Sequence, residues 1–273
     1  MALPDSLTLV YHADEPHPRQ VPLPAVYTRL DIPPPAGRPA VILNMVQTLD
    51  GAIAIDGKAW QIGSEVDHYL FRTLRGWADA VLSGAGTLRH NDLVATTHPH
   101  LQAQRQAAGR SVNPMGIVVS RRAEFSDEVL QKRFFTRQDF ASMVLTTELA
   151  GEADRRRIEE AGAEVCVVPL TPAGEVDLAE ALAMLADRGI QKVLAEGGPD
   201  TNRRLAEAHA IDELFLTVTP RVAGVPGIPR ITAGILGGGR AELTVISEYQ
   251  FRAPDLLEWY LRFKMVSFEP AGR

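Results

Sequence analysis

The 273-residue chain has a single cysteine, Cys166, and aromatic residues make up only 6% of it. One cysteine cannot form an internal disulfide or a cysteine-based zinc site, so a reducing compartment is expected. No apolar run approaches the length of a membrane span, and the N-terminus has no basic segment followed by an apolar one. We therefore expect a cytoplasmic protein with no membrane partner. The excess of acidic residues, 34 against 28 basic, argues against a nucleic-acid partner.

Motifs of several common enzyme classes are missing as well. The chain has no G-x-S-x-G, P-loop or H-E-x-x-H sequence, which removes the common hydrolase and kinase routes. Zinc deaminases need a P-C-x-x-C motif, which a single cysteine excludes. His98 and His100 flank a proline without a suitably placed third ligand, so a loop is favoured over a metal site.

What is present is the composition of an ordinary globular protein, with 45% hydrophobic and 23% charged residues. Proline is unevenly spread, since nine of the 19 prolines lie in the first 39 residues. Because proline fixes φ and lacks an N–H donor, residues 1–37 are expected to form an extended arm rather than a folded layer. The arm is either a loose tail or a segment that packs against the domain or a partner subunit.

Strands and helices are expected to alternate after the arm. Apolar runs predict strands at 40–46, 80–82, 116–119, 143–146, 165–168 and 192–195. Helical spacing predicts helices at 64–77, 152–161 and 178–187, the first with Ser64 as N-cap and Asp67 as its capping-box partner.

The last third changes character, with strands expected at 212–219, 241–247 and 256–263 and no helices between them. The glycine-rich stretch 224–239 predicts a long mobile loop, because glycine resists ordering. The whole pattern predicts one α/β domain over residues 38–273. Its mixed, mostly parallel sheet is flanked by helices and closes with antiparallel C-terminal strands.

Two glycine segments follow predicted strands, where backbone N–H groups of α/β sheets approach anions closely. The first, Gly84 to Thr87, reads Gly-Ala-Gly-Thr and lacks the third glycine of the Rossmann fingerprint. The second, Glu196 to Asn202, combines a carboxylate at a strand end, two glycines and a proline at a helix start. Both segments suit phosphate binding, and both also suit a plain turn from strand to helix.

Two further strand ends carry polar side chains. Asp50 precedes Gly51, a pair typical of a hairpin turn, although its carboxylate belongs to the same sheet edge as the glycine segments. Ser120, Arg121 and Arg122 end another strand, and two guanidinium groups beside a hydroxyl suit the 2′-phosphate of a cofactor. An exposed basic pair is the alternative.

Taken in order, these stretches resemble the reductase half of the riboflavin-pathway deaminase-reductases, a family with a dihydrofolate reductase-like fold. The run from Asn44 to Gly51, which ends in Thr-Leu-Asp-Gly, resembles the family's SLDG strand. The family's LRA…DAILVGAGT, VLVEGGP, VDEL and APVLLG segments are similar to residues 74–87, 193–199, 211–214 and 219–224. The resemblance covers about residues 38 to 265 in the family's order and approximate spacing. Each piece is common, but the ordered set is specific.

The resemblance implies an NADPH-dependent oxidoreductase of riboflavin biosynthesis. Such an enzyme reduces 5-amino-6-(5-phosphoribosylamino)uracil, or its diaminopyrimidinone analogue, to the ribitylamino product. The sugar opens to a carbon that accepts hydride, so the protein supplies positioning and a proton source. The resemblance also implies a homodimer, which we expect to form through sheet edges near residues 256–263.

The resemblance further implies roles for individual residues. By family position the cofactor should contact Ala54, Thr87, Asn91, Ser120 and the turn with Gly198, Pro199, Asp200 and Thr201, and the strand ends themselves add Gly84, Gly197 and Arg121. Asn44, Arg75 and Glu196 should face the phosphorylated pyrimidine. Asp50 and Glu196 are the catalytic candidates, with Asp50 as the proton donor if a dry pocket raises its pKa.

The chain departs from the family pattern on the substrate side. Asn44 stands where many members have lysine, and residues 91–98 lack the arginine that helps hold the substrate phosphate. Arg105 and Arg110 are candidates to replace that contact. Two other functions therefore stay open: reduction of another C=N or C=O substrate such as a dihydrofolate-like pterin, and non-catalytic binding of a nucleotide.

Overall fold

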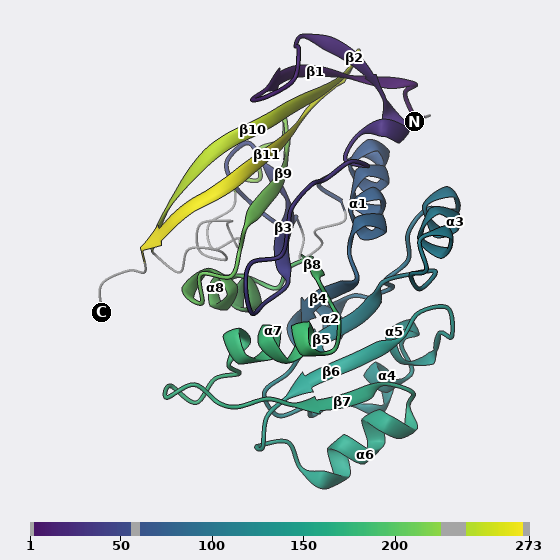
Figure 1. Cartoon of the computed structure of the whole chain (residues 1–273), viewed down its shortest axis with the longest axis vertical. Helices are drawn as coiled ribbons and strands as arrows, with labels where there is room; N and C mark the ends of the chain where they lie inside the picture. The colour runs from purple at the N-terminus through teal and green to yellow at the C-terminus, as the bar shows by residue number, and fades with distance from the viewer. Residues whose placement is uncertain (1–2, 56–60, 225–238, 270–273) are drawn as a thin grey trace. The chain divides into compact units, whose positions relative to one another are not determined.

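The computed structural model describes residues 3–55, 61–224 and 239–269 (Figure 1). The chain divides into two compact units. Unit 1 comprises Met1–Asp31, Ile42–Phe71 and Asn202–Arg273, and unit 2 comprises Ile32–Val41 and Arg72–Thr201. The single domain expected over residues 38–273 stays a prediction. The mobile loop expected at 224–239 falls on residues 225–238, which lie outside the described residues.

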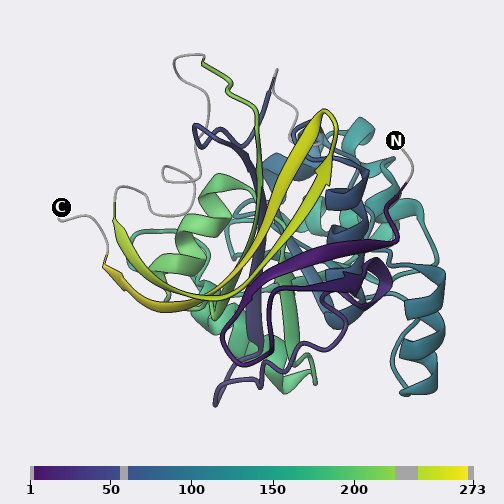
Figure 2. The ribbon, with the colours of Figure 1, turned by 90° about the horizontal axis from the view of Figure 1, so that it is seen from above.

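Unit 1 is built on strands in the order β2-β1-β10-β11-β9-β3. Their bounds are β1 (Ser6–His12), β2 (Arg19–Pro22), β3 (Ala40–Thr48), β9 (Glu213–Thr219), β10 (Arg240–Ala253) and β11 (Leu256–Glu269). β3 and β9 are parallel, and the other neighbouring strands are antiparallel. The last two strands form a long curved hairpin (Figure 2). The expected strands at 241–247 and 256–263 are therefore confirmed, and both are longer than predicted.

The N-terminal segment is not a loose tail; β1 and β2 pack against other strands, as the second alternative expected, but they do so as strands of a folded layer rather than as an extended arm. β1 pairs with β2 on one side and β10 on the other, and Leu7 and Leu9 are 1% and 0% exposed. Alternation with a period of two places both leucines on one face, and this pattern outweighs the proline content. Pro22 ends β2, an edge strand where the missing N–H donor is tolerated.

β11 also differs from its expected role. It lies between two strands, pairing with β10 along its length and with β9 over residues 259–264. Residues 259–264 therefore do not form a free sheet edge, and the predicted seam near 256–263 is not tested beyond this point. The homodimer itself stays a prediction.

Unit 2 is built on parallel strands in the order β8-β4-β5-β6-β7. Their bounds are β4 (Ala80–Gly84), β5 (Met115–Val119), β6 (Ser142–Thr146), β7 (Glu164–Val167) and β8 (Lys192–Ala195). Every residue of β4 and β6 is buried, which explains why continuous apolar runs located them. All five strands were predicted to within two residues at either end.

Helices accompany these strands, and Figure 1 shows α6 beside β7. They are α1 (Glu65–Trp77), α2 (Ala85–His90), α3 (Pro99–Ala107), α4 (Asp127–Leu130), α5 (Arg133–Thr136), α6 (Glu152–Glu160), α7 (Leu178–Asp187) and α8 (Pro199–Glu207). α1, α6 and α7 were predicted.

The fold is α/β, with a mixed, largely parallel sheet and antiparallel C-terminal strands. In the described part of the chain, no helix is long and apolar enough to cross a membrane.

The start of α1 confirms one part of its predicted cap and corrects another. The Val66 N–H donates to Ser64 Oγ at 3.1 Å, as expected of an N-cap serine. The Ser64 N–H, however, donates to Glu258 Oε1 at 3.0 Å. Glu258 of β11 therefore takes the capping-box role predicted for Asp67, because tertiary packing brings a better-placed carboxylate to the helix end.

Candidate functional site

The two glycine segments predicted from the sequence lie side by side in unit 2. They follow the parallel neighbours β4 and β8, and the Gly84 N–H donates to the Gly197 carbonyl at 3.2 Å. A methyl group on Gly84 would lie 2.5 Å from Thr201 Oγ1, and one on Gly198 would lie 3.2 Å from Thr87 Oγ1. Each threonine hydroxyl thus fills the space that a side chain on the opposite segment would need.

The backbone at this junction is shaped for a close approach to an anion. Gly197 and Gly198 have φ values of 104° and 98°, in the left-handed region that favours glycine. α8 begins at Pro199, and the N–H groups of its first turn carry the positive end of the helix dipole. A methyl group on Gly86 would meet no atom within 4 Å, so open space borders the first turn of α2. The exposed Asp200 also lies in the first turn of α8.

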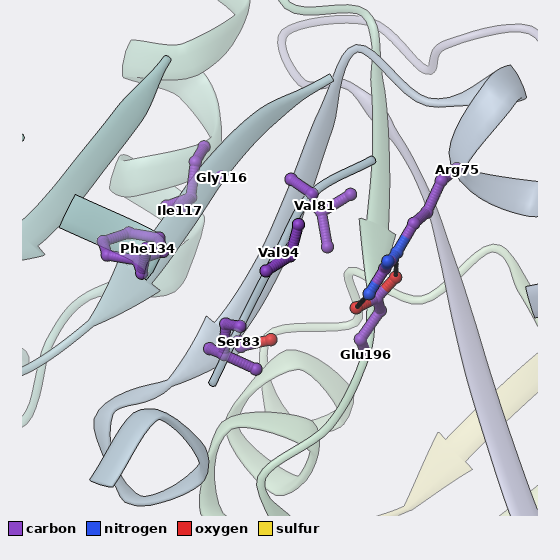
Figure 3. A pocket seen from close by; sticks show the side chains of 10 residues that line it. Arg75, Val81, Ser83, Val94, Gly116, Ile117, Phe134 and Glu196 are labelled. Carbon is purple, nitrogen blue, oxygen red and sulfur yellow. Dashed lines mark hydrogen bonds and ion pairs between the residues drawn. The ribbon is translucent and has the colours of Figure 1, made fainter. Parts of the chain in front are cut away.

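Arg75 and Glu196 form a buried ion pair in unit 2 (Figure 3). Arg75 Nε donates to Glu196 Oε1 at 2.6 Å and Nη2 donates to Oε2 at 2.8 Å, and their side chains are 10% and 4% exposed. Two parallel charge-assisted bonds fix both side chains in one geometry. The pair lines a small pocket together with Val81, Ser83, Leu93, Val94, Ala95, Gly116, Ile117 and Phe134. Glu196, the first residue of the second glycine segment, is thereby held in place.

Arg105 and Arg110 are not available as phosphate ligands, which corrects that prediction. Arg105 is 4% exposed and donates to the main-chain oxygens of Gly76, Ala78 and Ser111. Arg110 donates to main-chain oxygens at the end of α1 and pairs with Asp79 at 2.8 Å. Both arginines satisfy carbonyl groups that a helix C-terminus leaves without partners.

The residues expected around the cofactor's 2′-phosphate lie at and after the end of β5. Ser120 is buried, and its hydroxyl accepts a hydrogen bond from the Ala123 N–H at 3.1 Å. Arg121 donates to the Gly174 carbonyl at 3.3 Å and lies 3.8 Å from a Glu175 oxygen, with its side chain 43% exposed. These are weak partners at an exposed position, so the Arg121 guanidinium can exchange them for another anion.

Asn91 ends α2. Its Nδ2 donates to the Thr87 carbonyl at 3.2 Å, and its main-chain N–H donates to the same oxygen at 2.8 Å. The side chain that was expected to contact cofactor is therefore a C-terminal cap in this structure. Asn91 lies at the C-terminal end of the short helix α2, and the glycine junction lies at the N-terminal end of the same helix.

Asp50, Asn44 and Ala54 belong to unit 1. Asn44 lies half-buried in β3, and Ala54 follows the turn after that strand. The Asp50 carboxylate accepts hydrogen bonds from Thr48 Oγ1 at 2.6 Å, the Ala223 N–H at 3.0 Å and the Gly224 N–H at 3.2 Å. These bonds lower the pKa of Asp50 to about 2, with the Thr48 hydroxyl contributing most. With these bonds in place the raised pKa expected of a proton donor is not found, and the acid role of Asp50 stays a prediction.

Unit 1 contains a buried acidic cluster of Asp67 and Glu258 that was not predicted from the sequence. Glu258 is 1% exposed, and its Oε2 accepts from the Ser64 hydroxyl and the Tyr260 hydroxyl, both at 2.5 Å. Asp67 is 8% exposed; burial and then the nearby Glu258 raise its pKa to about 7, against a hydrogen bond from Thr217. No local signal reveals this cluster, because its members come from α1, β9 and β11. In the ranges that the structure describes, no group of three or more histidine, cysteine or acidic residues could hold a metal ion.

Known proteins share both the sequence pattern and the fold. A family model described as RibD C-terminal domain matches residues 39–267. The 2,5-diamino-6-ribosylamino-4(3H)-pyrimidinone 5′-phosphate reductase of Archaeoglobus fulgidus is 28% identical over 201 residues, which are 72% of this chain and 87% of that protein. The protein of the same name from Methanothermobacter thermautotrophicus is 29% identical over 187 residues, 68% of this chain and 80% of that one.

The fold is similar to that of a solved pyrimidine reductase-like protein from Corynebacterium diphtheriae. That structure superposes with a TM-score of 0.67 at 24% identity. The match covers 84% of this chain and 92% of that chain. At this identity the likeness establishes the fold alone.

Proposed function

The chain belongs to the RibD C-terminal domain family, and from this premise we propose that it is an NADPH-dependent pyrimidine reductase of riboflavin biosynthesis. Its substrate is 5-amino-6-(5-phosphoribosylamino)uracil or the diaminopyrimidinone analogue, and its product is the ribitylamino compound. The names of the curated relatives support the reaction. The observation that carries the proposal is the interlocked pair of glycine segments at the ends of β4 and β8.

A nicotinamide dinucleotide fits the residues at this junction. Gly84 and Gly198 lie where a Cβ atom would come within 3.2 Å of a threonine hydroxyl of the opposite segment, so glycine at both positions lets the two segments pack closely against each other. The N–H groups at the start of α8 and the left-handed glycines before it suit a diphosphate. Thr87 and Thr201 add hydroxyl groups that bind phosphate oxygens.

When bound, the dihydronicotinamide supplies the hydride, and the protein contributes binding, orientation and exclusion of water. The glycine segments hold the dinucleotide, and Arg75 fixes the carboxylate of Glu196 directly before Gly197. Glu196 and Asp50 both accept hydrogen bonds through both carboxylate oxygens. This arrangement favours positioning roles for the two carboxylates over donation of a proton.

Oxidation of NADPH, followed by its absorbance, tests the proposal directly. We expect saturable oxidation with the ribosylaminopyrimidine phosphate and none with dihydrofolate. The opposite preference would point to a pterin reductase. Measurable NADPH binding without oxidation of either substrate would point to a non-catalytic nucleotide-binding protein.

Replacing Gly86 with alanine separates cofactor binding from folding. The added methyl group meets no atom of the chain within 4 Å, and alanine is favoured over glycine in a helix by about 0.5–1 kcal/mol. We therefore expect unchanged or slightly higher stability together with NADPH affinity lowered by about 10-fold or more, since one misplaced contact of about 1.4 kcal/mol has that effect. Calorimetric titration and thermal unfolding measure the two quantities. Gly109→Ala, in a loop with φ 72°, should show the reverse: a loss of stability and intact NADPH affinity.

Replacing Arg121 with alanine tests the choice between cofactors. Within the described residues the partners of the Arg121 guanidinium are weak, and NADPH, unlike NADH, carries a 2′-phosphate for it to bind. We expect the dissociation constant of NADPH to rise by about 10-fold, as for the loss of one charge-assisted hydrogen bond. The affinity for NADH should stay nearly unchanged. An equal loss for both nucleotides would assign Arg121 a structural role.

A further inference from the structure

The Asp50 carboxylate joins two segments of unit 1 that are far apart in the sequence. Its Oδ1 accepts from the Thr48 hydroxyl and the Ala223 N–H, and its Oδ2 accepts from the Gly224 N–H. The Leu49 N–H adds a main-chain bond to the Arg221 carbonyl at 2.8 Å. The turn after β3 and the segment after β9 are thereby held together at the carboxyl ends of these parallel strands.

The turn that carries Asp50 is itself tightly closed. The Thr48 N–H donates to the Ala52 carbonyl at 2.9 Å, and the Ala52 N–H donates to Thr48 Oγ1 at 2.9 Å. Thr48 is fully buried, and Gly51 has φ of 83°, a value that other residues rarely adopt. Asp50 therefore projects from a fixed support, and the segment Arg221–Gly224 takes its position from that support.

Arg221 is the charged residue of the segment Arg221–Gly224, which Asp50 holds in position. Its guanidinium is exposed and donates through Nη1 to the main-chain oxygen of Gln61, a neutral acceptor. Arg75, by contrast, is neutralised by Glu196, and Arg105 is buried against main-chain oxygens. Arg221 stands just beyond the carboxyl end of β9, and ligands of open α/β sheets bind outside the carboxyl ends of the strands.

We propose that Asp50 is a positioning residue that fixes Arg221 at the carboxyl ends of β3 and β9, where Arg221 binds the phosphate of the substrate. The identity of the phosphate ligand rests on the proposed function; the positioning by Asp50 rests on the contacts alone. Arg221 supplies the cation that residues 91–98 lack. An arginine is suited to this role because its planar donors match phosphate oxygens.

Four variants test the two halves of the proposal. Arg221→Ala should raise KM for the phosphorylated substrate about 10- to 100-fold and change kcat by less than about threefold, as for a lost charged hydrogen bond. KM for the dephosphorylated substrate should not change. Asp50→Ala should raise KM in the same way, and Asp50→Asn should be intermediate, because its amide oxygen can still accept from Thr48 and Ala223. Asp255→Asn, at the exposed turn between β10 and β11, is the charge-matched control.

Hydrogen exchange of the Ala223 and Gly224 amides supplies a readout that needs no substrate. These amides should be protected in the wild type and in Asp255→Asn, partly protected in Asp50→Asn and unprotected in Asp50→Ala. If Asp50→Ala does not fold, the intermediate values of Asp50→Asn carry the test. Binding of inorganic phosphate, lost in Arg221→Ala, tests the anion site even if the wild type does not turn over the pyrimidine.

Three results would overturn the inference. Unchanged exchange in both Asp50 variants would refute the positioning. An unchanged KM and unchanged phosphate binding in Arg221→Ala would refute the anion site. Loss of kcat in Asp50→Asn, with disappearance of one limb of its pH profile, would assign the acid role to Asp50.

Discussion

Replacing Glu196 with alanine should lower the free energy of unfolding by about 3–5 kcal/mol, because the variant leaves the Arg75 guanidinium buried without its counter-charge. The two side chains are 4% and 10% exposed, so water can reach neither group to compensate. kcat/KM for NADPH-dependent reduction should fall by about two orders of magnitude, the effect of a catalytic geometry displaced by about 1 Å. Urea unfolding and steady-state oxidation of NADPH measure the two losses.

A double variant separates the structural loss from the catalytic one. Arg75→Met with Glu196→Leu removes both charges while keeping apolar volume, and such replacements of buried pairs are often neutral for stability. We expect it to regain most of the lost stability and none of the lost activity. Glu152→Ala is the control, since its pair with Arg156 on α6 is 89% and 66% exposed, a setting in which ion pairs contribute about 0–1 kcal/mol. Recovery of activity in the double variant would show that the pair matters for folding alone.

The sequence predicted unit 2 better than unit 1 for a physical reason. The strands of unit 2 are parallel and buried on both faces, so continuous apolar runs mark them. β1 carries a two-residue alternation instead, and the nearby prolines obscured it although they lie outside that strand. The short helices α4 and α5 have four residues each, too few for a helical period to appear.

In the candidate site, too, features that depend on local sequence were predicted, and features that depend on distant residues were not. The glycine segments were found because two backbones that pack this closely after neighbouring strands need glycine itself, and the structure brings both segments together. Roles that depend on long-range partners were not predictable. Asp50 gained two acceptor bonds from residues more than 170 positions away, and Ser64 is bonded to Glu258 across 194 positions.

Asp67 makes the stability of this protein depend on pH. Its pKa is about 7 in the folded chain and 3.8 in the absence of burial. Between these values the folded state keeps a proton that the unfolded chain has released, so stability falls as pH rises from about 4 to about 7. A shift of about three units corresponds to at most about 4 kcal/mol. The wild type should therefore be more stable at pH 5 than at pH 8.

Asp67→Asn should remove this dependence, because the amide stays neutral and has the size of the protonated carboxyl group. Asparagine still offers an oxygen to the Thr217 hydroxyl, which donates to Asp67 in the wild type. The absence of a side chain on Gly63 leaves the space that the Asp67 carboxyl group occupies, since a methyl group there would lie 2.0 Å from Asp67 Oδ2, and an amide of the same size fits that space. We expect the variant to match the wild type near pH 4 and to unfold at a higher temperature at pH 8.

Glu65→Gln is the matched control for Asp67→Asn. Glu65 lies in the same first turn of α1, but its side chain is 64% exposed and 3.8 Å from His68, so its removal should change stability by less than about 1 kcal/mol. Thermal unfolding of the three proteins from pH 4 to pH 9 separates burial from charge number. A slope between pH 4 and pH 7 that survives in Asp67→Asn would assign the bound proton to another member of the cluster.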